Sequence, residues 1–235
     1  EDFGNDIFST KLNHNNEKDL YEKAINLLSI IHNNSDLEVQ NLKKYNFEIL
    51  LNESLLFIEW YLEKHLKLNL NNSEKNEFQN ILERQFNSLT LKQNSIVLRD
   101  FHVDNLIYLD ERDGINQLGL IDYQDALVGS SVYDFTSLIE DVRHPIQDDL
   151  KNSLVETYSK LISVDQNELE RGISFYSIQR NLKIVGIFSR LKYRDDKKNY
   201  FPMIEVAWGF INNHLKNNEY KDLNNWMNNI MNNSL

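Results

Sequence analysis

Two short runs of polar side chains, residues 98–105 and 121–125, carry residue types that could do chemistry. Asp100 and Asn105 lie in the first run, and Asp122 lies in the second. Carboxylate and amide oxygens are ligands that Mg²⁺ prefers in proteins, where phosphate oxygens often complete its coordination. If the fold brings the two runs together, they therefore indicate a divalent-cation site that handles a phosphate group.

The two runs flank a predicted β-hairpin, residues 105–121. Its strands are the apolar segments 106–109 and 118–121, and a turn at residues 110–114 joins them. Gly114 closes this turn, a position where hairpins favour glycine. Because a hairpin folds back on itself, the two polar runs should meet at one edge of the sheet.

The remaining apolar residues recur at helical spacing, apart from one more short apolar run at residues 95–98. Pro145 and Pro202 stand where helices should start or stop. We expect a mainly α protein with a small β-hairpin, an α+β fold, without internal repeats or a flexible linker. The predicted helices cover residues 17–33, 46–67, a segment after Ser73, 132–142, 146–162, 166–193, 201–216 and 220–231.

The composition excludes several classes of protein. The chain of 235 residues has a net charge of −11, which argues against nucleic acid or an anionic membrane surface as its main partner. It contains no cysteine, so disulfides, thiolate zinc sites and cysteine nucleophiles are ruled out. No apolar run approaches the roughly 20 residues that cross a bilayer, and no signal peptide opens the chain. We expect a cytoplasmic protein.

The polar runs and the hairpin between them are similar to the catalytic core of the kinase-like aminoglycoside phosphotransferase family. An isolated Asp-x-His pair is weak evidence, but here order, spacing and hairpin occur together. Within that family the chain most resembles the anomeric sugar kinases that phosphorylate N-acetylmuramate or N-acetylglucosamine. The segments that carry the resemblance are Asp100-x-His102-x-x-Asn105, Ile121-Asp122, Gln124-Asp125-Ala126, Tyr133-Asp134-Phe135, Glu59-Trp60-Tyr61-Leu62 and residues 179–191.

The resemblance implies a role for each matching residue. Asp100 would be the catalytic Asp, which accepts or orients the proton of the attacking hydroxyl. Asn105 and Asp122 would hold Mg²⁺ against the nucleotide phosphates, and His102 would contact the phosphoryl group during its transfer. Asp134 would be a buried structural residue that hydrogen-bonds to the backbone of the catalytic loop.

The resemblance also implies where ATP and the sugar bind. Ile107 and Ile121 would form an apolar floor under the adenine. The segment Glu1-Asp2-Phe3 resembles the hinge between kinase lobes, where backbone groups bind the adenine. The sugar would bind near three further side chains. These are Gln124, Asp125 and Asp141.

The implied domain organisation is that of a kinase without its first lobe. No Gly-rich loop and no strand-borne Lys precede the hinge, so we expect the nucleotide-covering N-lobe to be missing and the chain alone to be inactive. Leu98 stands where the family usually has a His. The expected parts are a hinge and linker at residues 1–10, a helical C-lobe at 11–235, and within it the catalytic loop 98–105, the hairpin 105–121 and the metal-binding segment 121–125.

We interpret the chain as part of an ATP-dependent enzyme that transfers the γ-phosphate to a sugar hydroxyl. The expected acceptor is the anomeric hydroxyl of an amino sugar in cell-wall recycling. An aminoglycoside or another small molecule is the alternative acceptor, because acidic clefts attract cations. A non-catalytic pseudokinase or helical binding module is the alternative from another class. A phosphohydrolase is disfavoured, because a two-metal site needs additional His and Asp ligands.

Overall fold

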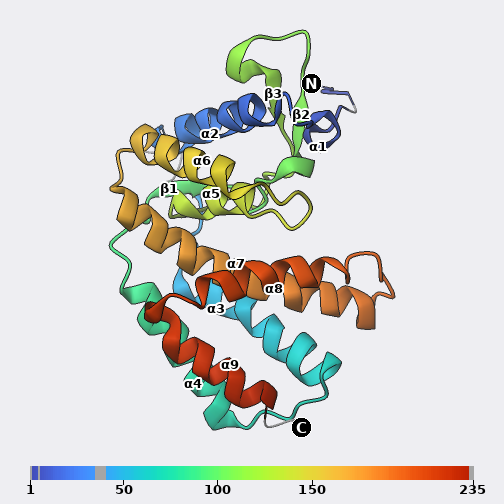
Figure 1. Ribbon diagram of the computed structural model, residues 1–235, viewed down its shortest axis with the longest axis vertical. Coiled ribbons are helices and arrows are strands. Elements are labelled where there is room, and N and C mark those ends of the chain that lie inside the picture. Colours follow the sequence, from blue (N-terminus) through green and yellow to red (C-terminus); the bar gives the residue numbers. More distant parts are fainter. Residues whose placement is uncertain (1, 5, 35–40, 233–235) are drawn as a thin grey trace. The chain divides into compact units, whose positions relative to one another are not determined.

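A computed structural model describes residues 2–4, 6–34 and 41–232 of the chain. These residues form two compact units, whose elements are labelled in Figure 1. Unit 1 comprises the residues up to Tyr45 together with Leu91–Ile173, and unit 2 comprises Asn46–Thr90 together with the residues from Ser174 on. Within the described ranges, no helix is both long and apolar enough to cross a membrane.

Unit 1 contains the predicted hairpin. β2 (Leu106–Tyr108) pairs antiparallel with β3 (Leu118–Leu120). Gly114 begins the short 3₁₀ turn that leads into β3, and its φ of +60° lies in the left-handed region that glycine enters without steric cost. The sequence therefore predicted this part of the fold correctly.

A second strand pair in unit 1 was predicted only in part. β1 (Ser95–Val97) pairs antiparallel with β4 (Leu127–Gly129), a strand that the sequence analysis missed. β4 has three residues and ends in glycine, so it shows neither an alternating pattern nor the usual length of a strand. Its position depends on distant residues as well, because the backbone N–H of Tyr45 donates to the carbonyl oxygen of Val128 at 2.7 Å.

One helix of unit 1 is buried along its whole length. Every residue of α5 is buried, including the polar Asp134, Thr136 and Ser137. Buried polar side chains need hydrogen-bond partners, and those of Asp134 lie at the candidate site described below. The helices of unit 1 are α1 (Phe8–Lys11), α2 (Glu17–Asn33), α5 (Val132–Ile139), α6 (Asp148–Leu161) and the first part of α7 (Gln166–Arg194).

The secondary structure of the described part of unit 2 consists of helices joined by turns and loops. A capping box starts α4, where Asn71 and Glu74 each bond to the other's backbone N–H. The elements of unit 2 are α3 (Phe47–Leu56), the π-helix η3 (Phe57–His65), α4 (Asn72–Asn87), the second part of α7, α8 (Met203–His214), the 3₁₀ turn η6 (Asn218–Tyr220) and α9 (Lys221–Asn232).

The predicted helix at residues 46–67 changes type in its middle. It is an α-helix up to Leu56 and a π-helix from Phe57 on. Gly186 of α7 packs directly against this junction, since a Cβ atom on it would lie 2.4 Å from the carbonyl carbon of Leu56. Backbone atoms cannot give way as side chains do, so only glycine allows this approach.

We expect Gly186→Ala to lower the free energy of unfolding by about 1–3 kcal/mol, because the added methyl group overlaps the backbone of α3 and η3. Gly209→Ala is the matched control, because nothing lies within 4 Å of a Cβ atom there. Gly209 lies within α8, where alanine favours the helix more than glycine does, so Gly209→Ala should raise the free energy of unfolding by about 0.5–1 kcal/mol. Urea unfolding followed by circular dichroism measures both changes. Equal effects of the two substitutions would contradict the proposed close contact.

Candidate active site

A buried carboxylate holds the start of the catalytic loop, residues 98–105. The backbone N–H of Leu98 donates to Oδ2 of Asp134 at 2.6 Å, and that of Arg99 donates to Oδ1 at 2.9 Å. Arg99 has a φ of +72°, a conformation that costs a non-glycine residue energy. The two hydrogen bonds to Asp134 offset that cost. This is the arrangement that the resemblance implies for Asp134.

A polar network lies behind this carboxylate. Nε2 of His32 is 3.7 Å from Oδ2 of Asp134, and both side chains are buried. Nδ1 of His32 meets the hydroxyl of Tyr158, which also donates to the carbonyl oxygen of Ser131. Burial raises the pKa of Tyr158 and the nearby Asp134 carboxylate raises it further, so the hydroxyl keeps its proton. α2, α5 and α6 are therefore tied together directly behind the loop.

The rest of the loop presents Asp100 to solvent and fixes Asn105. Asp100 is exposed. Nδ2 of Asn105 donates to the carbonyl oxygen of Asp100 at 3.0 Å and lies 3.3 Å from Nε2 of His102. Because the amide nitrogen is committed to these contacts, the amide oxygen of Asn105 is the atom available to a ligand.

His102 lies beside Asn105. It is only 6% exposed, and its Nε2 faces the amide of Asn105. The contact with the phosphoryl group that the resemblance implies for His102 stays a prediction. A buried imidazole in this position orients Asn105.

Asp122 meets the loop at the base of the hairpin. The backbone N–H of Ile121 donates to the carbonyl oxygen of Asn105 at 3.2 Å, so Asp122 follows directly after a residue paired with Asn105. Asp122 is exposed, has a φ of +60°, and accepts a hydrogen bond from Nε2 of Gln124 at 2.6 Å. The two predicted metal ligands therefore lie on adjoining strand ends, and both offer hard oxygen atoms.

The side-chain oxygens of Asn105 and Asp122 suit a Mg²⁺ ion that is also bound by phosphate oxygens. In the part of the chain that is described, no group of three or more His, Asp or Glu side chains could hold a metal by itself. Mg²⁺ commonly takes one or two protein oxygens and completes its shell with phosphate oxygens and water. Asn105 and Asp122 would supply the protein share.

The predicted adenine-binding residues differ in how accessible they are to a ligand. Ile107 is only 4% exposed and forms a β-bridge with Ile7, whereas Ile121 is 41% exposed. Phe3 packs on the same hairpin, since a Cβ on Gly119 would lie 2.9 Å from its ring. The ring of Phe3, from the predicted hinge segment, therefore covers Gly119 of β3, and Ile121 offers the accessible apolar surface. Asp2 is exposed and its Oδ1 accepts from the N–H of Gly4 at 2.9 Å, while Glu1 lies outside the described residues.

Comparison with known proteins identifies the family. Residues 3–171 match the family model described as "Phosphotransferase enzyme family". The chain belongs to this phosphotransferase family. The N-acetylmuramate/N-acetylglucosamine kinase of Neisseria meningitidis serogroup B is 33% identical over 170 residues. That match covers 69% of this chain and 49% of the relative, so the chain spans about half the length of that kinase.

Solved structures of phosphotransferases share the fold. A choline/ethanolamine kinase family protein from Mesorhizobium loti aligns with a TM-score of 0.58 at 9% identity, covering 85% of this chain and 62% of that protein. The AMP-bound spectinomycin phosphotransferase aligns with a TM-score of 0.52 at 13% identity, covering 79% and 66% respectively. At such identities the likeness establishes the fold.

The three predicted sugar-binding residues of this chain differ in accessibility. Gln124 and Asp125 are exposed beside Asp122. Asp141 is completely buried, and its Oδ1 accepts from both the backbone N–H and the Nη1 of Arg143, at 3.0 and 3.1 Å. Burial argues against contact between Asp141 and a substrate.

Arg143 is a residue that the sequence analysis missed. Besides Asp141, its Nε lies 3.4 Å from Oδ2 of Asp104, which is part of the catalytic loop. The other oxygen of Asp104 accepts from the hydroxyl of Ser9 at 2.6 Å. Both ends of the loop are thus held, the first by Asp134 and the second by Arg143. No local pattern reveals a contact between residues so far apart in sequence.

We expect Arg143→Ala to lower the free energy of unfolding by about 3 kcal/mol, because it leaves the fully buried Asp141 without its cation. Arg84→Ala is the matched control, because Arg84 pairs with Asp222 at 3.0 Å but both side chains are more than half exposed. It should cost less than about 1 kcal/mol. Chemical denaturation measures both. A loss from Arg143→Ala as small as that from the control would contradict a structural role for this pair.

Proposed function

We propose that this chain carries the catalytic segment of an enzyme that transfers the γ-phosphoryl group of ATP to a hydroxyl of an amino sugar. The observation that carries the proposal is the meeting of the loop 98–105 with Asp122 at the base of the hairpin, through the hydrogen bond between Ile121 and Asn105. Membership of the phosphotransferase family supports the reaction type. The name of the Neisseria relative supports the choice of acceptor.

Asp100 is the residue proposed to handle the proton. It is exposed, and its backbone is fixed by Asn105 on one side and by the Asp134-bound residues on the other. The acceptor hydroxyl attacks the γ-phosphorus, its proton passes to the Asp100 carboxylate, and the bond from the phosphorus to the leaving ADP oxygen breaks. Catalysis would come from positioning the reactants rather than from covalent chemistry.

Asn105 and Asp122 are proposed to hold Mg²⁺. The bound ion would neutralise the charge of the ATP phosphates. His102 fixes the direction of the Asn105 amide, and Gln124 does the same for Asp122 through their 2.6 Å hydrogen bond. Ile121 contributes apolar surface for the adenine. The additional N-lobe inferred from the sequence stays a prediction.

The experiment measures ADP release by the complete product of the gene that encodes this chain, with Mg·ATP and N-acetylglucosamine, N-acetylmuramate or kanamycin. Asp100→Asn should lower kcat by about 10²–10⁴ with little change in the KM for ATP, because it removes a group used in the transition state. Asp122→Ala should weaken nucleotide binding and turnover together. Asp110→Asn, an exposed acid in the hairpin turn, is the control and should change neither.

Each result distinguishes the alternatives. Turnover with kanamycin but not with the amino sugars would show that the acceptor is an aminoglycoside, while the proposed phosphoryl transfer would stand. Binding of sugar or nucleotide without any ADP release would favour a binding module. Equal and mild effects of Asp100→Asn and Asp122→Ala would place the chemistry elsewhere.

A further inference from the structure

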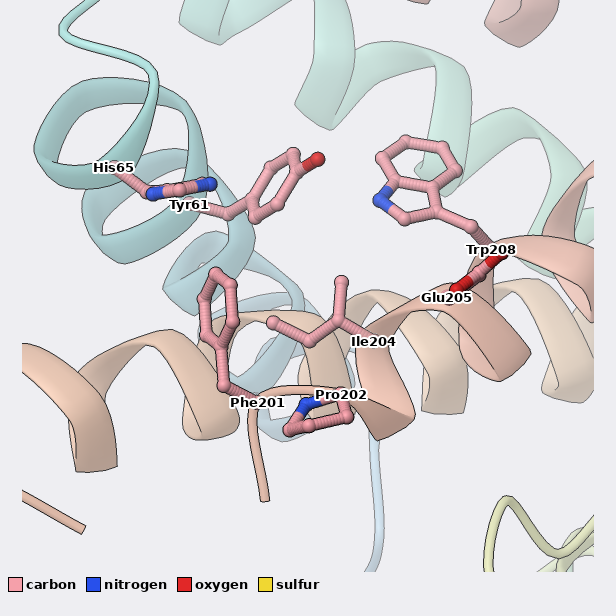
Figure 2. A pocket seen from close by; sticks show the side chains of 7 residues that line it. All are labelled: Tyr61, His65, Phe201, Pro202, Ile204, Glu205 and Trp208. Atoms are coloured by element: carbon pink, nitrogen blue, oxygen red, sulfur yellow. The ribbon is translucent and has the colours of Figure 1, made fainter. Parts of the chain in front are cut away.

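Unit 2 contains a cavity of about 370 Å³, which the proposed phosphotransfer does not use. Figure 2 shows it between the π-helix η3 and the start of α8. A volume in this range suits a small organic ligand. The residues that line it include four aromatic rings, one aliphatic side chain and one carboxylate: Tyr61, His65, Phe201, Trp208, Ile204 and Glu205.

The aromatic wall is preformed. Each ring of the wall contacts the next. The ring centroids are 5.7 Å apart for Trp208 and Tyr61, 5.3 Å for Tyr61 and His65, and 5.0 Å for His65 and Phe201. Phe57 lies behind them in the core, edge-on to Trp208 and stacked on Tyr61. The π-helix places Tyr61 and His65 on one side of the cavity, and such helices are frequent at functional sites.

The polar groups of the cavity call for a ligand that both donates and accepts hydrogen bonds. The Nε1 edge of Trp208 is turned toward Tyr61 in Figure 2, and a hydrogen bond from this N–H to the Tyr61 hydroxyl opposes the rise in the Tyr61 pKa that burial causes. The Tyr61 hydroxyl has its own proton to donate to a ligand. Glu205 is exposed and provides an acceptor at the same cavity.

The charges around the cavity disfavour a cationic ligand. Nζ of Lys192 lies 3.4 Å from the centroid of the Phe201 ring, so a cation already occupies that aromatic face. After burial, the charges of Lys192 and Lys67 further lower the pKa of His65. A second positive charge would therefore be repelled on the His65 side, and among the residues that line the cavity Glu205 alone is acidic.

We propose that this cavity binds a pyranose sugar ring. The C–H groups on one face of a pyranose form an apolar surface that packs on aromatic rings, and the hydroxyls around its edge donate and accept hydrogen bonds. Aromatic walls, the Tyr61 hydroxyl and the Glu205 carboxylate match these requirements. The inference rests on unit 2 alone and concerns binding, so it does not depend on the proposed phosphotransfer.

Isothermal titration calorimetry of the 235-residue chain with N-acetylglucosamine, in the absence of nucleotide, tests the proposal. We expect saturable binding that Trp208→Ala weakens at least about tenfold, the worth of one good aromatic contact. Glu205→Gln should weaken it about threefold, and because Glu205 is exposed this change leaves the core intact. Asn212→Ala, at an exposed position further along α8, is the control and should bind as the parent does.

Two results would overturn the proposal. The first is sugar binding that is absent, or that is equal in the parent, Trp208→Ala and Glu205→Gln. The second is binding of choline, a cationic probe, through Trp208 and Glu205 in place of the sugar. Asp100→Asn separates this site from the active site: it should lower ADP release by the complete gene product yet leave the calorimetric affinity of the 235-residue chain for the sugar unchanged.

Discussion

The carboxylate of Asp134 accepts two backbone hydrogen bonds from the start of the catalytic loop, and the candidate site depends on this interaction. A fully buried charge is costly unless it is compensated, and here the N–H groups of Leu98 and Arg99 compensate it together with the neighbouring His32. The geometry in turn holds Arg99 at a positive φ. A short buried helix thereby fixes the direction in which Asp100 leaves the core.

A second constraint closes the site from the other side. β2 and β3 pair in a register that leaves Asn105 and Ile121 joined at the base of the hairpin. Asp122 follows at a positive φ, so it turns away from the strand direction. Arg143 then fixes the loop near its end through Asp104. Strained residues held by several contacts are typical of functional sites, because the surrounding structure keeps them in one conformation.

The sequence predicts the parts of this fold that local patterns govern. The helix α2 spans the predicted residues 17–33, and the hairpin appears where the two apolar runs and Gly114 predict it. β4 and the change to a π-helix at Phe57 were missed, because pairing with β1 and packing of Gly186 decide them. The same holds at the site. Motif spacing and the family resemblance select Asp100, Asn105, Asp122 and Asp134 as candidates, whereas the burial of Asp141 and the link from Arg143 to Asp104 arise from long-range contacts.

Amide hydrogen exchange at Leu98 and Arg99, followed by NMR, tests most directly whether Asp134 holds the loop. In the parent chain both amides should be protected, as hydrogen-bonded groups are. Asp134→Asn keeps one acceptor oxygen and loses the other, so one of the two amides should exchange at least about tenfold faster, while amides of α4 in unit 2 are unaffected. Unchanged protection at both Leu98 and Arg99 in this variant, or free exchange of both in the parent, would contradict the account.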